Sequence, residues 1–386
     1  MFEDLPLFLV RLSLGFVIGA ALGFVARRGR FCSLGAIEDA VYANDTRRLR
    51  SWILAIGVAI IGVHALELWG GLDLTRSIYL GQRLEWGALV LGGFLFGIGM
   101  ALNGTCGLGT LRQLGGGDLK ALVSFLVIGV VAMMTLRGFA GVARIALTEP
   151  FTLALPQSFS QRLPEMAGLR GTGASLLAIA IGSAIALFAF NHKGFRSSLR
   201  FAATGAAIGL LIALGWWATG IAGFDSFDTR RIESFTFIGP LGETLYYLML
   251  STALQPDFPI GAAFGVVLGA FIAAKTDGSF KWEVSANAND MKRRLLGASL
   301  MGFGGITALG CTIGQGVTGL STLSVGSALA TVSIVAGGRV GLYLLVERKW
   351  ARRDAPVSAV TAKATVAKTA VAKAVVAHER ISCSEP

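Results

Sequence analysis

The sequence predicts an all-α polytopic membrane protein, and three observations lead to this prediction. Of the 386 residues, 54% are hydrophobic and only 15% are charged, whereas soluble domains are about 25% charged. Several apolar runs reach roughly 17 to 23 residues, which is the length that a helix needs to cross a bilayer. Glycine supplies 52 residues, about twice its usual share of ~7%, and glycines four residues apart let membrane helices pack closely.

The predicted transmembrane helices number about nine. Each is an apolar run bounded by polar or basic residues, and together they cover residues 7–26, 51–69, 85–103, 119–136, 176–191, 201–221, 258–274, 295–309 and 323–346. Two further segments, 31–45 and 239–254, are too short to cross and are predicted to be re-entrant or buried half-helices. The stretch from 137 to 170 contains three prolines and is predicted to be a long external loop.

The basic residues predict the orientation of the chain. They cluster in short segments between apolar runs and in the C-terminal tail, as in cytoplasmic loops. Arg27, Arg28 and Arg30 directly follow the first span, so that end is expected to be cytoplasmic, which gives a periplasmic N-terminus and, after nine spans, a cytoplasmic C-terminus. The N-terminus is acidic and lacks the features of a signal peptide. The net charge of +11 is explained in this way without a nucleic acid partner, and it would also attract an anionic substrate.

A Gly-rich unit containing one cysteine recurs along the chain. Two copies read LGGFLFGIGMALNGTCGLGTLRQL and GASLMGFGGITALGCTIGQGVTGL, and a looser copy reads GFVIGAALGFVARRGRFCSLG. Each copy predicts an apolar helix, a break at the cysteine and a second, short helix. The predicted spans place the copies that contain Cys106 and Cys311 in opposite orientations. We therefore expect an inverted repeat with halves 1–192 and 193–350, followed by a low-complexity cytoplasmic tail, 351–386.

The breaks are the predicted substrate site. Backbone N–H groups and the positive end of the helix dipole face the gap where each new helix begins, which favours an anion. A thiol adds a weak S–H donor and a soft acceptor, so the site suits a sulfur-bearing anion. The candidate substrate-binding residues are the three cysteines and their neighbours: Cys32, Cys106, Cys311, Gly107, Gly109, Thr312 and Gly314.

Several alternatives remain open at this point. Each cysteine has the simpler interpretation of a small buried hydrophobic residue, and the polar residues near the breaks that of caps or helix–helix contacts. A membrane thiol–disulfide or sulfurtransferase enzyme is a rival function, but the sequence contains no CxxC motif. A soft-metal transporter is another. No cofactor or metal site is expected. His64 and Glu67 form either a proton relay or an interfacial pair, and Cys383 is expected to be an incidental thiol.

Three segments resemble a known family. RGRFCSLGAI, GMALNGTCGLGTLRQLGGGDL and GGITALGCTIGQGVTGLSTLSVGS are similar to the signature segments of the YeeE/YedE family of bacterial inner-membrane proteins. The resemblance implies thiosulfate uptake by an hourglass-shaped, multi-pass monomer. It also implies that Cys32, Cys106 and Cys311 lie along a central path. The anion would pass from one thiol to the next through S–H···S hydrogen bonds. The resemblance further implies a TusA-like cytoplasmic sulfur-carrier partner, although other family members are linked to selenium or other sulfur compounds.

Overall fold

The computed structural model describes residues 6–81, 83–154, 161–224, 231–284 and 288–347. Its contacts divide the chain into two units, Met1–Gly341 and Leu342–Pro386. Apart from residues 342–347, all of the architecture below belongs to the first unit. The predicted low-complexity tail and Cys383 lie outside the described residues, and the division of the membrane part into two halves stays a prediction.

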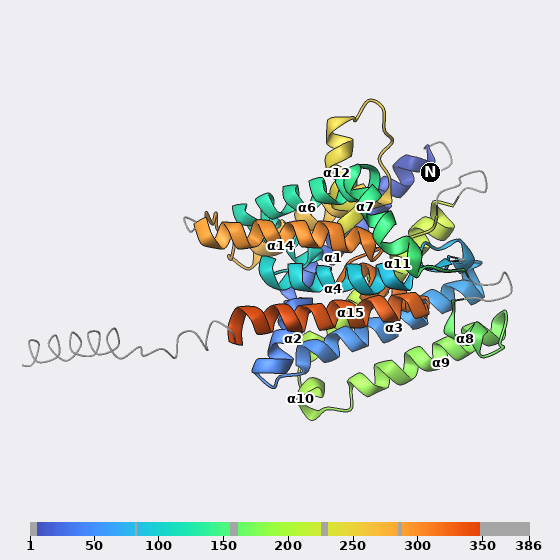
Figure 1. Cartoon of the computed structure of the whole chain (residues 1–386). Helices are drawn as coiled ribbons and strands as arrows, with labels where there is room; N and C mark the ends of the chain where they lie inside the picture. Colours follow the sequence, from blue (N-terminus) through green and yellow to red (C-terminus); the bar gives the residue numbers. More distant parts are fainter. Residues whose placement is uncertain (1–5, 82, 155–160, 225–230, 285–287, 348–386) are drawn as a thin grey trace, which may run out of the picture. The chain divides into compact units, whose positions relative to one another are not determined.

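Helices make up almost all of the secondary structure in the described part of the chain, which confirms the predicted all-α class (Figure 1). The α-helices are α1 (Leu7–Arg28), α2 (Ser33–Tyr42), α3 (Arg47–Gly70), α4 (Trp86–Asn103), α5 (Gly107–Gly115), α6 (Leu119–Arg137), α7 (Phe139–Thr148), α8 (Leu163–Met166), α9 (Thr172–Ala189), α10 (Lys193–Arg196), α11 (Leu199–Trp217), α12 (Ile238–Met249), α13 (Phe258–Thr276), α14 (Ala288–Thr307) and α15 (Val325–Leu342).

Short elements complete this set. Two 3₁₀-helices, η1 (Leu74–Arg76) and η2 (Glu149–Phe151), lie in loops, and three π-helices extend α-helical segments: η3 (Ala218–Ala222), η4 (Gly314–Gly319) and η5 (Tyr343–Glu347). Strands β1 (Arg83–Leu84) and β2 (Leu153–Ala154) pair antiparallel. The segment predicted as one long loop therefore contains α7, η2, β2 and α8, and α7 can form because residues 139–148 are mostly apolar and contain no proline.

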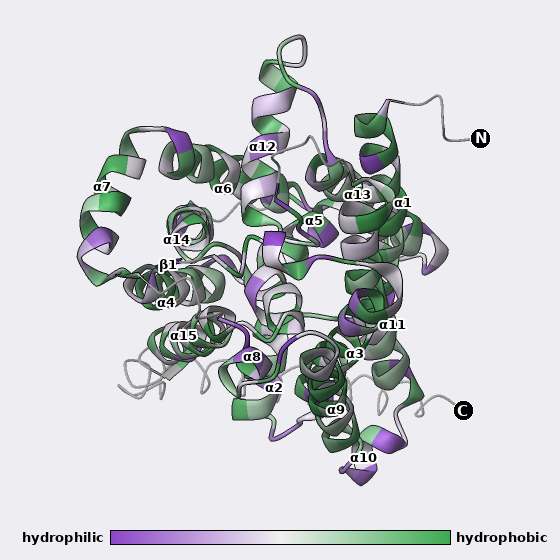
Figure 2. Ribbon diagram, turned by 90° about the vertical axis from the view of Figure 1, so that its right-hand side faces the viewer, coloured by the Kyte–Doolittle hydropathy of each residue, from purple (hydrophilic) through white to green (hydrophobic). Residues whose placement is uncertain are grey.

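Within the described residues, eight helical segments are long and apolar enough to cross a membrane, so the chain is a multi-pass membrane protein. Figure 2 shows these long helices coloured mainly as hydrophobic. All of the predicted spans except one lie in these segments or extend at most two residues beyond them. The remaining one, 295–309, coincides with most of α14, whose first turns are too polar to meet the same measure of hydropathy. The predicted half-helices 31–45 and 239–254 correspond to α2 and α12.

Glycines allow α1 and α13 to pack in direct backbone contact. A methyl group at Gly19 would lie 2.6 Å from the carbonyl oxygen of Ala262, and one at Gly23 would overlap the backbone of Val266. The contacts advance in the same direction along both helices, so α1 and α13 run parallel. Dispersion between closely approaching backbones supplies the helix association that lipid cannot drive.

The two most similar repeat copies meet through α4 and α14, which lie side by side (Figure 1). Gly92 contacts Gly304, and Gly99 contacts Gly297, so the register runs in opposite directions along the two helices. α4 and α14 are therefore antiparallel, which is the relation that two copies of an inverted repeat require. Each of these helices leads directly to its cysteine.

Candidate functional site

The three breaks share one backbone conformation. The residue two positions before each cysteine is left-handed, with φ of 52° at Arg30, 83° at Gly104 and 57° at Leu309. The next backbone N–H bonds back across the last helical turn in two of the copies, Phe31 to Ala26 at 3.0 Å and Gly310 to Gly305 at 2.8 Å. A left-handed residue that reverses the chain in this way is a common end of an α-helix.

Each cysteine is then the first, half-helical residue of the next helix. Cys32 precedes α2 and Cys106 precedes α5, both in extended conformation. Cys311 precedes the helical turn at Thr312 that continues as η4. At this N-cap position a side chain lies beside N–H groups that have no helical acceptor. The N–H of Gly314 accordingly donates to the Cys311 sulfur, at 3.4 Å.

A glycine follows each cysteine by three residues, and each one keeps the first helical turn open. A methyl group at Gly109 would overlap the Thr105 hydroxyl and lie 3.7 Å from the Cys106 sulfur. At Gly314 it would lie 2.6 Å from the Thr236 hydroxyl, and at Gly35 it would lie 2.6 Å from the Arg48 guanidinium. Because the glycine has no side chain, the side chains of Thr105, Thr236 and Arg48 can pack directly against the start of the helix that follows each cysteine.

The fold brings the three breaks together. The Ser33 hydroxyl, directly after Cys32, donates to the Thr312 hydroxyl, directly after Cys311, at 3.2 Å. The start of α5 and the Cys311 break contact the same segment, since Gly107 packs against Phe237 and Gly314 against Thr236, and Arg112 of α5 donates to the carbonyl of Phe31. Cys311 and Cys106 are buried, whereas Cys32 is partly exposed. The three breaks thus lie in one region of the fold.

Gly107 and the polar residues near the breaks have separate surroundings. Gly107 packs against Phe237, whose Cβ would lie 3.2 Å from an added methyl group. Asn103 is occupied structurally, because its amide donates to the Thr105 carbonyl and its oxygen accepts from Ser124. Gln315 donates to the carbonyl of Ala308 at 2.6 Å. Hydrogen bonds within and between helices therefore account for Asn103 and for the amide nitrogen of Gln315.

Four buried polar atoms around the breaks lack a hydrogen-bond partner among the described residues: the Trp52 indole nitrogen, the Tyr79 and Thr105 hydroxyls and the Gln315 amide oxygen. Trp52 stacks on Phe31, with ring centroids 4.6 Å apart. Burial and, to a smaller extent, Glu233 and Cys311 raise the pKa of Tyr79, so its hydroxyl remains a donor at any ordinary pH. Buried donors without a partner are costly unless a ligand or water binds them. Nothing in the sequence around Trp52 and Tyr79 indicated that their side chains would lie near the breaks with an unpaired donor.

Two polar pockets border the breaks on either side. The Cys311-side pocket, of about 560 Å³, is lined by Leu309 and Gln315 from that break and by Tyr79, Arg83 and Arg231. The Cys32-side pocket, of about 900 Å³, is lined by residues of that break together with the end of α5 and the start of α11, and its charged residues are Arg27, Arg28, Arg30, Arg112, Arg200 and Asp277. The Cys311 and Cys32 breaks thus each contribute to a pocket that contains arginines, and the Cys311-side pocket also contains Glu85.

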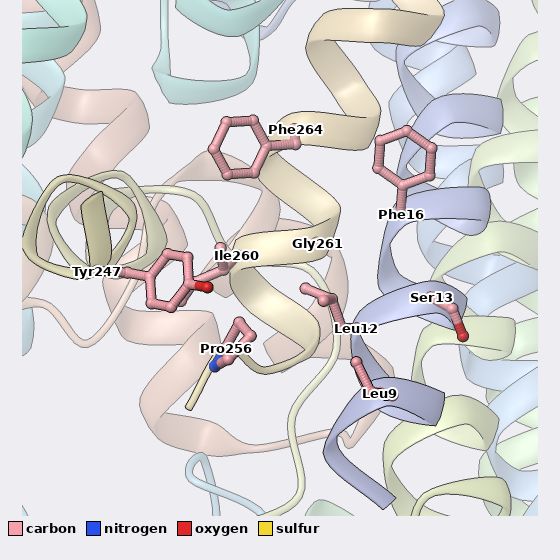
Figure 3. A pocket seen from close by; sticks show the side chains of 9 residues that line it. All are labelled: Leu9, Leu12, Ser13, Phe16, Tyr247, Pro256, Ile260, Gly261 and Phe264. Carbon is pink, nitrogen blue, oxygen red and sulfur yellow. The ribbon is translucent and has the colours of Figure 1, made fainter. Parts of the chain in front are cut away.

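A third pocket has a different character. It measures about 570 Å³ and lies where α1 and α13 meet Tyr247 of α12 (Figure 3). Its lining is almost entirely apolar, with Phe16 and Phe264 among its side chains, and it contains no ionisable group except the Tyr247 phenol. An anion would gain nothing there, so this pocket is not part of the site.

His64 and Glu67 do not form an evident proton relay. Both Glu67 oxygens accept from the Arg162 guanidinium, at 2.8 and 2.9 Å, and Ser175 donates to Glu67 at 2.8 Å. Arg162 is buried. The His64 Nδ1 is engaged with the carbonyl of Ile60 at 2.9 Å, and neither residue lines the two polar pockets. This arrangement favours a structural ion pair that fixes the α8 segment against α3.

Comparisons with known proteins identify the family of the chain. A family model described as sulphur transport matches residues 28–340. The thiosulfate transporter TsuA of Escherichia coli (strain K12) is 28% identical over 355 residues, which cover 87% of this chain and 92% of the relative. The thiosulfate transporter TsuA of Spirochaeta thermophila is 25% identical over 345 residues, covering 86% of this chain and 99% of the relative.

Proposed function

Because the chain belongs to the sulphur-transport family and is a transporter of sulfur compounds rather than an enzyme, we propose that its substrate is thiosulfate. The observation that carries the proposal is the meeting of three breaks, each with an N-cap cysteine, and an arginine-bearing pocket at two of them. Thiosulfate has an oxyanion end and a soft terminal sulfur, and the site offers a complementary partner to each.

The oxyanion end would bind N–H groups at the starts of α2, α5 and η4, where the helix dipole also favours negative charge. The terminal sulfur would accept from a cysteine S–H group. Three thiols in the order Cys311, Cys106, Cys32 would then pass the anion by exchange of weak hydrogen bonds, without forming a covalent bond. Gly107, Gly109, Thr312 and Gly314 form the turns along which this exchange takes place.

The charge distribution supports a proposed direction of transport. Arg27, Arg28 and Arg30 at the Cys32 break favour a cytoplasmic location for that end in a bacterial inner membrane, with the N-terminus on the periplasmic side. Thiosulfate would enter at the Cys311-side pocket and leave at the Cys32-side pocket. A TusA-like sulfur carrier would meet the transporter at the cytoplasmic end.

Uptake into proteoliposomes tests the substrate. Purified protein is reconstituted into vesicles, and radiolabelled thiosulfate is added outside them. Unlabelled sulfate, sulfite or selenite serves as a competitor. We expect saturable uptake that unlabelled thiosulfate abolishes and that equal sulfate inhibits only weakly, because sulfate has no terminal sulfur for the thiols. No uptake above protein-free vesicles, or stronger competition by selenite than by thiosulfate, would overturn the substrate assignment in favour of another sulfur or selenium anion.

A further inference from the structure

The Cys32-side pocket carries a large excess of positive charge. Five arginines and one aspartate line it, and they come from four separate segments of the chain. Among the described residues, the one ion pair in this group joins Arg28 to Asp277 at 3.5 Å, and both side chains are substantially exposed. An exposed pair of this kind contributes little, so the pocket keeps a large excess of positive charge.

The other guanidinium groups are held in place by neutral oxygens. Arg27 donates to the carbonyl of Arg112 and to the Ser279 hydroxyl, both at 3.2 Å. Arg112 in turn donates to the carbonyl of Phe31, at 3.3 Å, and Arg200 donates to the carbonyl of Arg28. Carbonyl oxygens orient these cations but do not neutralise them, so an anion in the pocket would gain from several charges at once.

Arg30 provides a second, independent observation. It lies in the left-handed region, where glycine is strongly favoured and where the equivalent residue of the Cys106 break is Gly104. Its side chain is exposed to the pocket and has no partner that the described residues supply. Leu309 shows that an uncharged side chain also occurs at the equivalent position, so what a ligand would explain at Arg30 is its unpaired charge in the pocket rather than its backbone conformation.

We propose that the Cys32-side pocket is a binding site for a tetrahedral oxyanion, separate from the thiols. The occupant is either a free divalent sulfur oxyanion or the phosphate of an anionic lipid, since both present the oxygens that guanidinium groups bind. The site goes beyond the proposed function because it needs no terminal sulfur. If thiosulfate is the transported anion, this is where it waits after leaving Cys32.

Isothermal titration of sulfate into the detergent-purified full chain tests the proposal. Sulfate is the probe because the thiol path is expected to discriminate against it. We expect saturable binding to the wild type and to Cys32→Ala. Arg30→Gly and Arg200→Gln should each bind about tenfold more weakly, the usual cost of losing one charge-assisted contact. Arg30→Gly should also unfold at an equal or higher temperature, because glycine relieves the left-handed strain.

The matched control is Arg196→Gln, which removes the same charge from α10 outside the pocket. Repeating the titration in phosphatidylglycerol and in phosphatidylcholine distinguishes the two sources. Sulfate binding suppressed by phosphatidylglycerol alone identifies the lipid phosphate, and binding kept in both lipids identifies a free oxyanion. No saturable binding to the wild type, or equal binding by Arg30→Gly and Arg196→Gln, overturns the proposal. These outcomes do not depend on thiosulfate uptake, so the two proposals can fail separately.

Discussion

Gly109 allows the shape of the predicted thiol site to be tested with one methyl group. In Gly109→Ala the new Cβ would overlap the Thr105 hydroxyl and lie in van der Waals contact with the Cys106 sulfur, at 3.7 Å. Thr105 must turn or the first turn of α5 must open, and the space beside the thiol is filled in either case. Overpacking of this kind costs about 1–3 kcal/mol. If that cost falls on the bound anion, affinity drops roughly five- to 150-fold.

The assay is the initial rate of thiosulfate uptake into proteoliposomes, normalised to reconstituted protein, over a range of concentrations. Gly239→Ala is the control, because a methyl group there meets nothing within 4 Å. Gly239→Ala is expected to transport as the wild type does, whereas Gly109→Ala should lose most uptake or require much higher concentrations. Wild-type uptake by Gly109→Ala would refute the view that the anion approaches the thiol across this glycine.

Two further predictions concern stability and are measured by thermal unfolding in detergent. Gly104 has φ of 83°, and a methyl group added there would meet nothing within 4 Å. Gly104→Ala should therefore lower the free energy of unfolding by about 1 kcal/mol from backbone strain alone. An unfolding temperature equal to that of Gly239→Ala would contradict the left-handed helix end. Glu67→Gln removes one of the two carboxylates that pair with the buried Arg162, the other being Glu165, and should lose about 2 kcal/mol, whereas Glu149→Gln, at an exposed carboxylate, should change little. Equal unfolding temperatures for Glu67→Gln and Glu149→Gln would show that the ion pair is unimportant.

The membrane fold could be predicted from sequence because the bilayer imposes it. Backbone polar groups inside lipid must be satisfied within each helix, so apolar length alone locates most spans. The span on α14 shows the limit of this rule, since Lys292, Arg293 and Arg294 in its first turns lower the local hydropathy. The repeated Cys and Gly spacing also indicated where the helices break.

The finer geometry of the site depends on contacts that spacing does not encode. Arg30 and Leu309 adopt the left-handed conformation although neither residue type signals it, and only Gly104 could have been recognised. Trp52 lies on an ordinary apolar span, and only tertiary packing places its indole beside Phe31 and the Cys32 break. The arginine pocket likewise joins segments as distant as Arg27 and Ser279.

Thiosulfate uptake by single cysteine variants tests the central claim most directly. Cys32→Ala, Cys106→Ala and Cys311→Ala are compared with wild type and with Cys383→Ala, which alters a thiol outside the repeated unit. At matched expression, we predict that the first three lose uptake while Cys383→Ala keeps it, because each break supplies one thiol of a continuous path. Normal uptake by all four variants would show that the cysteines only fill space in the helix packing, and would contradict the thiol path.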